Sequence, residues 1–510
     1  MTKGESAIRN PKSAIIWLLF AVVVVAVYFA GLTIPLVGPD EPRYAQVARE
    51  MFERGDWITP TLGGFHWFEK PALLYWLQIA SYSLFGVSEF SARFGSALFG
   101  LGTVASLWVL GRKAEGSDEN PERRSTIDFA NWLALIAAST AGIVAFAHGA
   151  SFDIILTFPI TAALVSFFIY DSGRGKGWLV SFYFFVGLAV LAKGLVGILF
   201  PFAIVGFYHL LAWKLPHRAL VFSLFWGMLF AAAVASTWYL PMYRRHGWEF
   251  VDQFFIQHHF QRYTSNKYLH PQPFYFFFWV LPLMTIPWLP FFVASLWELV
   301  GRVRTGSEEI AEAGAPGQIH RTSRPLQLFA IAWLTVPLLF FSFSGSKLPG
   351  YILPAVPAAV ILTAGFVYRF VQRNPFRRRL VEAIAASTFA VILIAIVAFV
   401  PGFAETDSLK SLFAVAHSRG LDGLPGMTMH RVNHNAEFYA TGPLVRDGEG
   451  KQNRLTGPKE VREEMTALGS SRALVLIPPE YIFHLTQSDL IRAEVLQSNE
   501  DWALTLVSER

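Results

Sequence analysis

Apolar runs of about 20 residues recur along most of this chain, and short polar turns separate them. A helix of that length crosses the roughly 30 Å hydrocarbon core of a bilayer. The pattern therefore predicts an all-α polytopic membrane protein with about 11 to 13 spans. The clearest runs cover residues 14–36, 89–111, 129–148, 153–171, 177–193, 194–213, 219–239, 274–299, 326–343, 348–370 and 380–402.

Basic residues in the loops predict the orientation of these spans. Lys and Arg are concentrated in every second loop, as cytoplasmic loops require. This alternation places the N-terminus in the cytoplasm, and it places residues 40–88, residues 240–273 and the C-terminal tail on the outer face. The basic segments are residues 3–12, 112–124, 174–176, 214–218, 302–324 and 369–379.

The outer stretch 40–88 has the pattern of helices that lie at a membrane surface. Residues 40–54 are apolar at i, i+3, i+4, i+7 and i+8, which predicts one amphipathic helix. We expect Asp40 to be its N-cap and Gly55 to end it. A second short helix is expected to run through Leu84. The apolar stripe of the first helix is Tyr44, Val47, Ala48, Met51 and Phe52.

Composition changes after residue 402, where apolar runs shorten and charged residues become more frequent. Residues 473–477 and 502–507 are short apolar runs that are typical of strands. We therefore expect a transmembrane domain at 1–402 and a small α/β domain on the outer face at 403–510.

Overall composition excludes several classes of protein. With 53% hydrophobic and 15% charged residues, the chain does not have the composition of a soluble protein. Its net charge of +5 follows from the basic loops, so no nucleic-acid partner is expected. The chain has no Cys, which excludes disulfides and thiolate chemistry. No Gly-rich phosphate loop follows a predicted strand, so we expect no nucleotide cofactor.

The segment Pro39-Asp40-Glu41-Pro42-Arg43-Tyr44 is the leading candidate for chemistry. Two carboxylates, an Arg and a Tyr stand where the first span leaves the membrane. One carboxylate would be enough to cap a helix, an interaction of about 1 kcal/mol. Two carboxylates beside a cation favour a catalytic role, with Asp40 as the base.

Other polar residues on the same face have a structural alternative as well as a functional one. A carboxylate or Lys at membrane depth usually faces a cavity or a partner, although caps, surface ion pairs and interface anchors are common. Two histidines alone are too few to define a metal site. These candidates are Glu69 and Lys70, Asp153, Lys193, His258 and His259 with Arg262, and Lys347 with Tyr351.

Carboxylates and cations on one face suit the transfer of a sugar from a lipid phosphate. A phosphate leaving group needs cations that hold its developing charge, and the incoming hydroxyl needs a base. A single in-line displacement then inverts the anomeric carbon. We expect the candidate residues to converge on one pocket outside the bilayer.

Five segments together resemble the bacterial aminoarabinose (4-amino-4-deoxy-L-arabinose) lipid A transferase branch of glycosyltransferase family 39. That family has the GT-C fold and is related to protein O-mannosyltransferases. The resemblance runs over roughly residues 14–370. Its segments are Asp40-Glu41-Pro42-Arg43-Tyr44-Ala45, Phe68-Glu69-Lys70-Pro71-Ala72-Leu73-Leu74-Tyr75-Trp76, Leu191-Ala192-Lys193-Gly194, His258-His259-Phe260-Gln261-Arg262-Tyr263 and Ser346-Lys347-Leu348-Pro349-Gly350-Tyr351-Ile352-Leu353-Pro354.

The resemblance implies a polyprenyl (undecaprenyl) phosphate sugar donor, a lipid A-like or protein acceptor, and the bacterial inner membrane as the location. Asp40 takes the position of the catalytic Asp, with Glu41 beside it and Asp153 at a second acidic position. A divalent metal, Zn or Mg/Mn, is left open, with Glu69 and His258 or His259 as its ligands. Donor-binding positions fall on Arg43, Tyr44, Lys70, Lys193, Arg262, Lys347 and Tyr351.

Two departures from the family pattern leave every reactive group in place. Pro42 stands where Ala is frequent after Asp-Glu, and Pro71-Ala72 where Pro-Pro is frequent after Glu-Lys. The C-terminal domain matches weakly, so the acceptor is not specified.

Two other functions fit part of the pattern. A transporter of lipid-linked sugars would bring inverted repeats and charges near the midplane; the chain shows no repeat, and its charges gather at one face. If the protein were a non-catalytic binding module, substitutions of Asp40, Glu69 and Lys70 would have almost no effect on any sugar chemistry.

Overall fold

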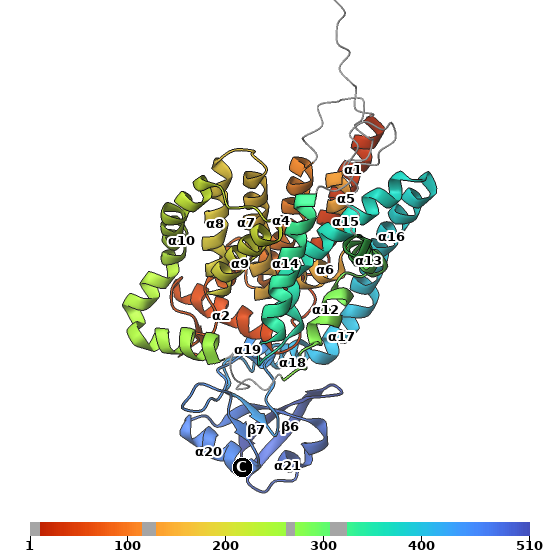
Figure 1. The fold of residues 1–510 in the computed structure, drawn as a ribbon. Helices are drawn as coiled ribbons and strands as arrows, with labels where there is room; N and C mark the ends of the chain where they lie inside the picture. The colour runs from red at the N-terminus through yellow and green to blue at the C-terminus, as the bar shows by residue number, and fades with distance from the viewer. Residues whose placement is uncertain (1–10, 115–128, 262–270, 306–323) are drawn as a thin grey trace, which may run out of the picture. The chain divides into compact units, whose positions relative to one another are not determined.

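The computed structural model describes residues 11–114, 129–261, 271–305 and 324–510 (Figure 1). The chain forms two compact units. Unit 1 comprises Met1–Ala30, Glu69–Leu74 and Gly95–Leu393, and unit 2 comprises Gly31–Phe68, Tyr75–Phe94 and Ile394–Arg510.

The regular secondary structure in the described part of unit 1 consists of helices. Two pairs of its helices are sharply bent, by 57° between α5 and α6 and by 119° between α12 and α13. Its elements are α1 (Pro11–Phe29), most of α4 (Glu89–Ala114), α5 (Phe129–Ala138), α6 (Ala141–Ala147), α7 (Phe152–Asp171), α8 (Gly177–Lys193), α9 (Val196–Leu211), α10 (Arg218–Val251), η2 (Asp252–Gln261), α12 (Phe276–Met284), α13 (Leu289–Thr305), α14 (Arg324–Ser342), η3 (Pro349–Ala355), α15 (Val356–Gln372) and α16 (Pro375–Ile394).

An apolar helix or bent helix pair coincides with each of the expected spans. Among the described residues, six helices are long and apolar enough to cross a membrane, and the two bent pairs raise that number to eight. The other expected spans correspond to the shorter apolar helices Trp17–Phe29, Gly177–Lys193 and Val196–Leu211. The prediction of a polytopic α-helical membrane protein is confirmed.

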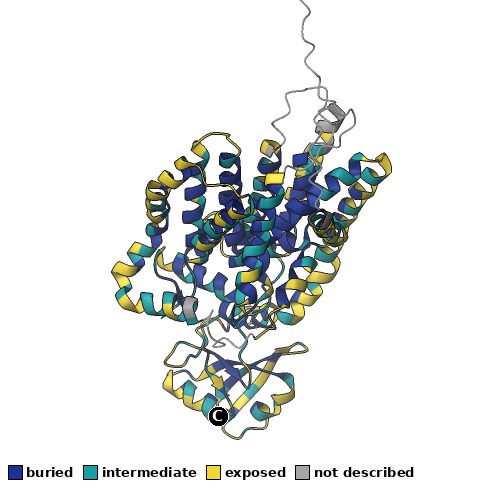
Figure 2. Cartoon of the chain, in the orientation of Figure 1, coloured by how far each residue is buried: buried dark blue, intermediate teal, exposed yellow. Residues whose placement is uncertain are grey.

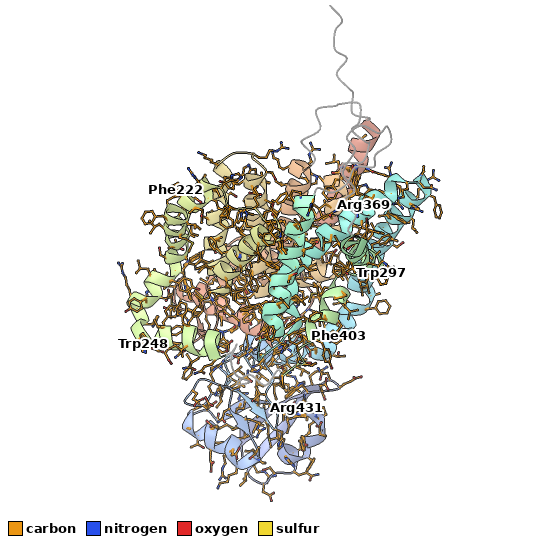
Figure 3. All side chains as sticks on the ribbon, viewed as in Figure 1. Phe222, Trp248, Trp297, Arg369, Phe403 and Arg431 are labelled. Atoms are coloured by element: carbon orange, nitrogen blue, oxygen red, sulfur yellow. The ribbon has the colours of Figure 1, made fainter. Side chains whose placement is uncertain are left out.

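Burial separates inner from outer helices within unit 1 (Figure 2). In the most apolar 18 residues of each helix, 89% of α7 and 94% of η3–α15 are buried, whereas only 28% of α10 with η2 is buried. The exposed faces remain apolar: Phe222 on α10 is 76% exposed and Trp297 on α13 is 80% exposed (Figure 3). Apolar side chains face outward in this way when the surrounding solvent is lipid.

A five-stranded sheet forms the end of unit 2, in the order β4-β3-β5-β7-β6. The strand β3 pairs in parallel with β4 and β5, and β7 pairs antiparallel with β5 and β6. Its strands are β3 (Gly426–Met429), β4 (Arg454–Leu455), β5 (Arg472–Ile477), β6 (Ile491–Ser498) and β7 (Ala503–Glu509).

Both faces of this sheet carry a hydrophobic core. On one face, Val475 and Ile477 of β5 pack in a hydrophobic cluster with Met427 and Val461. On the other face, Leu474 and Leu476 of β5 belong to a second cluster. The predicted strands at 473–477 and 502–507 are thus β5 and β7. The helices around the sheet are α18 (Lys410–Ser418), α19 (Ala436–Tyr439), α20 (Pro458–Ala467), η5 (Pro479–Tyr481) and α21 (Phe483–Thr486). The predicted fold class, a helical membrane protein with a small C-terminal α/β region, is confirmed.

The rest of unit 2 contains most of the stretch 40–88, namely residues up to Phe68 and from Tyr75 onward. The helix α2 (Asp40–Arg54) buries Tyr44, Val47, Ala48 and Met51, as its periodicity predicts, and Gly55 ends it with φ +64°. The N-cap expected at Asp40 is wrong: Pro39 occupies that position, and Asp40 is the first helical residue. The remaining elements are the hairpin β1 (Thr61–Leu62) and β2 (Phe65–His66), α3 (Leu73–Phe85), most of which lies in unit 2, and η4 (Ala395–Phe399) followed by α17 (Val400–Asp407). The predicted second short helix is α3.

Candidate active site

Asp40 presents its carboxylate at the first turn of α2. A guanidinium nitrogen of Arg43 donates to Asp40 Oδ1 at 2.5 Å, and Arg43 Nε donates to the carbonyl of Pro39 at 2.8 Å. The same guanidinium lies 5.6 Å from the centre of the Trp67 ring. Half of the Asp40 side chain is exposed. Arg43 therefore orients the carboxylate and leaves half of the side chain exposed.

Glu41, the adjacent acid, has a different environment. Arg93 donates to both of its carboxylate oxygens, at 3.2 and 2.6 Å, and the backbone N–H of Val37 donates to Oε2 at 3.1 Å. The side chain of Arg93 is only 5% exposed, and its guanidinium also donates to the carbonyls of Leu32, Ile34 and Pro35. This pair holds the segment before α2 in place.

Sequence reasoning missed Arg93. The signal was available, because an Arg at the outer end of an apolar run needs a partner or an anion. Its partner could not be identified from sequence, since Glu41 lies 52 residues away.

The other outer candidates near α2 lie on or beside folded elements. Tyr44 is buried on the core face of α2, at 7% exposure. Glu69 and Lys70 are half-buried in the turn before α3, and they belong to unit 1.

Three candidates from distant parts of unit 1 meet at the start of α7. Lys193, the last residue of α8, donates to Asp153 Oδ1, and each side chain of the pair is 18% exposed. The Lys193 ammonium also lies 4.7 Å from the centre of the Tyr351 ring. Asp153 does not cap α7, because Ser151 accepts from the backbone N–H of Asp153. Lys193, which was expected to need an anion, is thus paired with the carboxylate of Asp153.

Gly350 allows this meeting to occur. A Cβ added there would lie 1.9 Å from Asp153 Oδ2, so no side chain fits between η3 and the Asp153–Lys193 pair.

Lys347, in the turn before η3, is 6% exposed. Its ammonium donates to the carbonyls of Ser344 at 2.6 Å and Gln272 at 3.0 Å. Burial lowers the pKa of Lys347, because the charged form loses its hydration. Among the residues that the structure describes, these two carbonyls are its hydrogen-bond acceptors, and they use two of the three ammonium N–H donors.

The expected histidine site lies partly outside the described residues. His258 is half-buried on η2, whereas Arg262 and the side chain of His259 lie outside what the structure describes. Within the described part of the chain, neither Glu69 nor His258 belongs to a group of three potential metal ligands.

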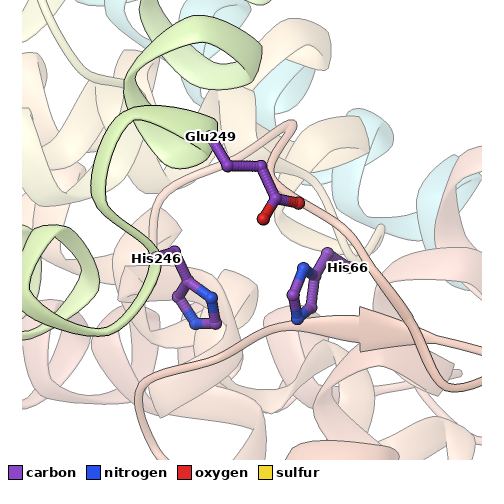
Figure 4. Close-up of side chains that lie close together, drawn as sticks. All are labelled: His66, His246 and Glu249. Atoms are coloured by element: carbon purple, nitrogen blue, oxygen red, sulfur yellow. The ribbon is translucent and has the colours of Figure 1, made fainter.

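Two other potential ligands occur in unit 1. His246 and Glu249 flank Gly247, where α10 is kinked at φ +54°, and a ring nitrogen of His246 lies within 4.8 Å of a Glu249 carboxylate oxygen (Figure 4). His66, drawn in the same figure, belongs to unit 2, where its ring stacks on Phe68 at 4.9 Å. The kink is not visible in the hydrophobic pattern, so this pair was not predicted.

The structure thus brings together two groups of candidates, Asp40 with Arg43 in unit 2, and Asp153 with Lys193 and Tyr351 in unit 1. The expectation that all of them share one pocket stays a prediction.

Comparison with known proteins identifies relatives for both sequence and fold. The family of dolichyl-phosphate-mannose-protein mannosyltransferases matches residues 13–252. An undecaprenyl phosphate-α-4-amino-4-deoxy-L-arabinose arabinosyl transferase of Shewanella sediminis is 30% identical over 390 residues, which are 74% of this chain and 65% of the relative. The protein of that description from Aeromonas hydrophila is 29% identical over 428 residues, 81% of this chain and 72% of the relative.

The fold has a solved counterpart. The crystal structure of ArnT from Cupriavidus metallidurans bound to undecaprenyl phosphate is similar with a TM-score of 0.72 and 22% identity, and the match covers 96% of this chain and 97% of that one. Its apo state gives a TM-score of 0.73. The likeness covers the helical region and the C-terminal sheet alike. The chain is therefore similar in sequence to bacterial aminoarabinose transferases and, over residues 13–252, to the dolichyl-phosphate-mannose-protein mannosyltransferases, and it has the GT-C fold of ArnT.

Proposed function

We propose that this protein is an inverting glycosyltransferase that moves a sugar from a polyprenyl phosphate, such as undecaprenyl phosphate, to a lipid A-like or other acceptor. Two findings support the proposal: the relatives are named as undecaprenyl phosphate-aminoarabinose arabinosyl transferases, and the fold matches that of ArnT. The donor lipid itself carries the activated sugar, so the reaction uses no nucleotide.

Asp40 is the general base of this reaction. It accepts the proton of the acceptor hydroxyl as that oxygen attacks the anomeric carbon. The bond from the anomeric carbon to the phosphate oxygen breaks, the polyprenyl phosphate leaves, and the configuration inverts. The main observation behind this assignment is that Asp40 is half-exposed and accepts a hydrogen bond from Arg43 through Oδ1 alone. Within the described residues Oδ2 has no hydrogen-bond partner.

The other candidate residues receive supporting roles in this proposal. Glu41 positions the segment before α2, since Arg93 occupies both of its oxygens. Asp153 orients Lys193, and the buried ammonium of Lys347 has a donor to offer a phosphate oxygen. The donor phosphate and sugar would be bound by Arg43, Tyr44, Lys70, Lys193, Arg262, Lys347 and Tyr351.

His246 and Glu249 at the α10 kink would supply two ligands of a divalent metal, and a complete site would need at least one more. An imidazole and a carboxylate, as supplied by His246 and Glu249, are ligands that Zn²⁺ accepts, and the carboxylate also suits Mg²⁺ or Mn²⁺. A metal bound there would neutralise charge on the donor phosphate. Glu69, His258 and His259 remain further candidate ligands.

We further propose the bacterial inner membrane as the location, with the N-terminus in the cytoplasm and with residues 403–510 as a periplasmic domain following the transmembrane domain 1–402. The alternation of basic loops supports this orientation.

Replacement of the base tests the proposal directly. We expect Asp40→Asn to lower turnover with a polyprenyl-phosphate sugar by roughly 10²- to 10⁴-fold, because the amide cannot accept the proton. Glu53→Gln is the matched control, since it changes an exposed acid on the same helix whose ion-pair partner, among the described residues, is Arg49. Purified Asp40→Asn protein that turned over at the rate of the unchanged protein would refute the assignment.

One observation favours a second acceptor class. The matching family is named for protein mannosyltransferases, so a protein hydroxyl is the alternative acceptor. Mass spectrometry of lipid A, polyprenyl lipids and periplasmic proteins, from cells with and without this protein, separates the two. Reconstituted protein that moves the donor across a vesicle bilayer without forming a product would instead indicate a transporter.

A further inference from the structure

The segment that leads into Asp40 has no regular secondary structure. Gly38 lies in it with φ +65°, and a Cβ built there would have no atom within 4 Å, so side-chain packing does not hold this residue. Hydrogen bonds to side chains far along the chain hold this segment instead. The backbone N–H of Gly38 donates to Asp407 Oδ2 at 2.7 Å, and that of Leu36 donates to the hydroxyl of Tyr439 at 2.7 Å.

The hydroxyl of Tyr439 is itself fixed. It donates to Glu89 Oε1 at 3.1 Å, and Lys410 pairs with that same oxygen at 2.7 Å. Burial, with the carboxylate of Glu89 nearby, raises the pKa of Tyr439, so the phenol keeps its proton and remains the donor to Glu89. It therefore accepts one hydrogen bond from the loop and gives one to an anchored carboxylate.

Further contacts join α19, which contains Tyr439, to other parts of the outer stretch. The guanidinium of Arg49 on α2 lies 6.0 Å from the centre of the Phe438 ring. Glu437 forms a buried ion pair with Arg446, whose Nε would lie 1.9 Å from a Cβ added at Gly63 in the tip of the hairpin β1–β2. This part of the C-terminal region is thus built against the segments on both sides of α2.

We propose that Tyr439 and Asp407 are positioning residues for the Asp40 carboxylate, acting through the backbone N–H groups of Leu36 and Gly38. The inference rests on the proposed function, because it assigns these residues to the reaction that Asp40 performs. They touch neither Asp40 nor a substrate; they fix the entry of the chain into the turn that presents the base. Misplacing a base by about 1 Å can cost roughly 10²-fold in rate.

The test uses two near-isosteric variants in the full-length protein. Tyr439→Phe and Asp407→Asn each weaken one loop contact with little change in shape. We expect kcat to fall roughly 5- to 20-fold in each, with the KM for the polyprenyl-phosphate sugar within about twofold of the unchanged protein. Hydrogen exchange should quicken in the peptide covering residues 31–40. Tyr481→Phe is the matched control, because it makes the same chemical change at an exposed position of the same region.

The outcomes separate the two proposals. If the unchanged protein shows no sugar transfer, the proposed function fails. The exchange measurement alone then still tests whether Tyr439 and Asp407 hold the segment before Asp40. If transfer occurs and Asp40→Asn abolishes it, but both variants keep the kcat and the exchange rate of the unchanged protein, then the positioning role is refuted. A loss of kcat shared equally by Tyr481→Phe would also refute it, because the effect would then be one of general stability.

Discussion

The Asp153–Lys193 pair shows what a charge near a membrane interface needs. Both side chains are mostly buried, so each depends on the other for its counter-charge. We expect Lys193→Met to destabilise the protein by about 2 kcal/mol, because Asp153 would keep a poorly solvated charge. Thermal melting of the purified protein measures this change.

A double variant provides the control for that prediction. Asp153→Asn together with Lys193→Met removes both charges, and we expect it to melt closer to the unchanged protein than Lys193→Met does. Equal losses for the single and double variants would show that the pair does not act as a unit.

Gly350 supports a second prediction at the same place. An Ala there would press its Cβ against Asp153 Oδ2, so Gly350→Ala should lower the melting temperature and disturb the ion pair. Gly206→Ala is the matched control, since Gly206 lies within α9 with open space around it, and Ala favours a helix by up to about 1 kcal/mol. A melting temperature of Gly350→Ala at or above that of the unchanged protein would contradict the close approach of η3 to Asp153.

At the residue scale, the sequence singled out charged residues that the structure shows to be paired or buried, but it did not reveal their partners. Asp40, Asp153, Lys193 and Lys347 could be singled out because charges at an apolar boundary are costly. Partners such as Arg93 for Glu41 depend on tertiary packing between residues far apart in sequence, which periodicity does not encode.

At the scale of elements, hydrophobic periodicity predicted the helices well and their breaks poorly. The stripe of α2 and every expected span correspond to helices, because burial and lipid exposure both act on side-chain pattern. The bends within α5–α6 and α12–α13 and the kink at Gly247 escaped prediction. Each depends on local backbone geometry, which leaves the apolar run unbroken.

The C-terminal sheet supplies a prediction about pH. His430 follows β3 with φ +64°, and its Nε2 lies 3.0 Å from His484 Nδ1. Burial, then the neighbouring His484 and Arg454, lowers the pKa of His430, while Glu480 raises it by less. Below an unfolded pKa of about 6.5 the unfolded state binds more protons than the folded state, so stability falls as the pH falls through that value.

Melting curves between pH 5 and 8 check this sign. The unchanged protein should lose melting temperature on acidification, and His430→Asn should lose less, because Asn tolerates positive φ and carries no titratable group. A His430→Asn variant with the full pH dependence would assign the effect to other groups.

At the scale of the whole molecule, orientation is the first property to test. Because the chain has no Cys, single introduced thiols report their own accessibility. We expect Gln487→Cys to react with a membrane-impermeant reagent in cells whose outer membrane alone is permeabilised, and Lys176→Cys to react only after the inner membrane is opened. Labelling in the reverse order would place the basic loops outside and contradict the proposed topology.

Unit 2 could not have been predicted as a unit. Sequence composition changes once, after residue 402, whereas the compact unit collects residues 31–68 and 75–94 as well as 394–510. Contacts such as Gly38 with Asp407 join segments that share no pattern along the chain. A shift in composition therefore predicts one domain boundary, whereas unit 2 is assembled from three separate segments.

The hydrogen bonds from Gly38 and Leu36 have a consequence for biosynthesis. Their acceptors follow 369 and 403 residues later in the chain. At roughly 5–20 residues per second, a ribosome needs about 20 to 70 seconds to advance from Gly38 to Asp407. A nascent chain therefore inserts most of its membrane helices before the turn at Asp40 acquires these hydrogen bonds, so the geometry around Asp40 is completed only late in synthesis.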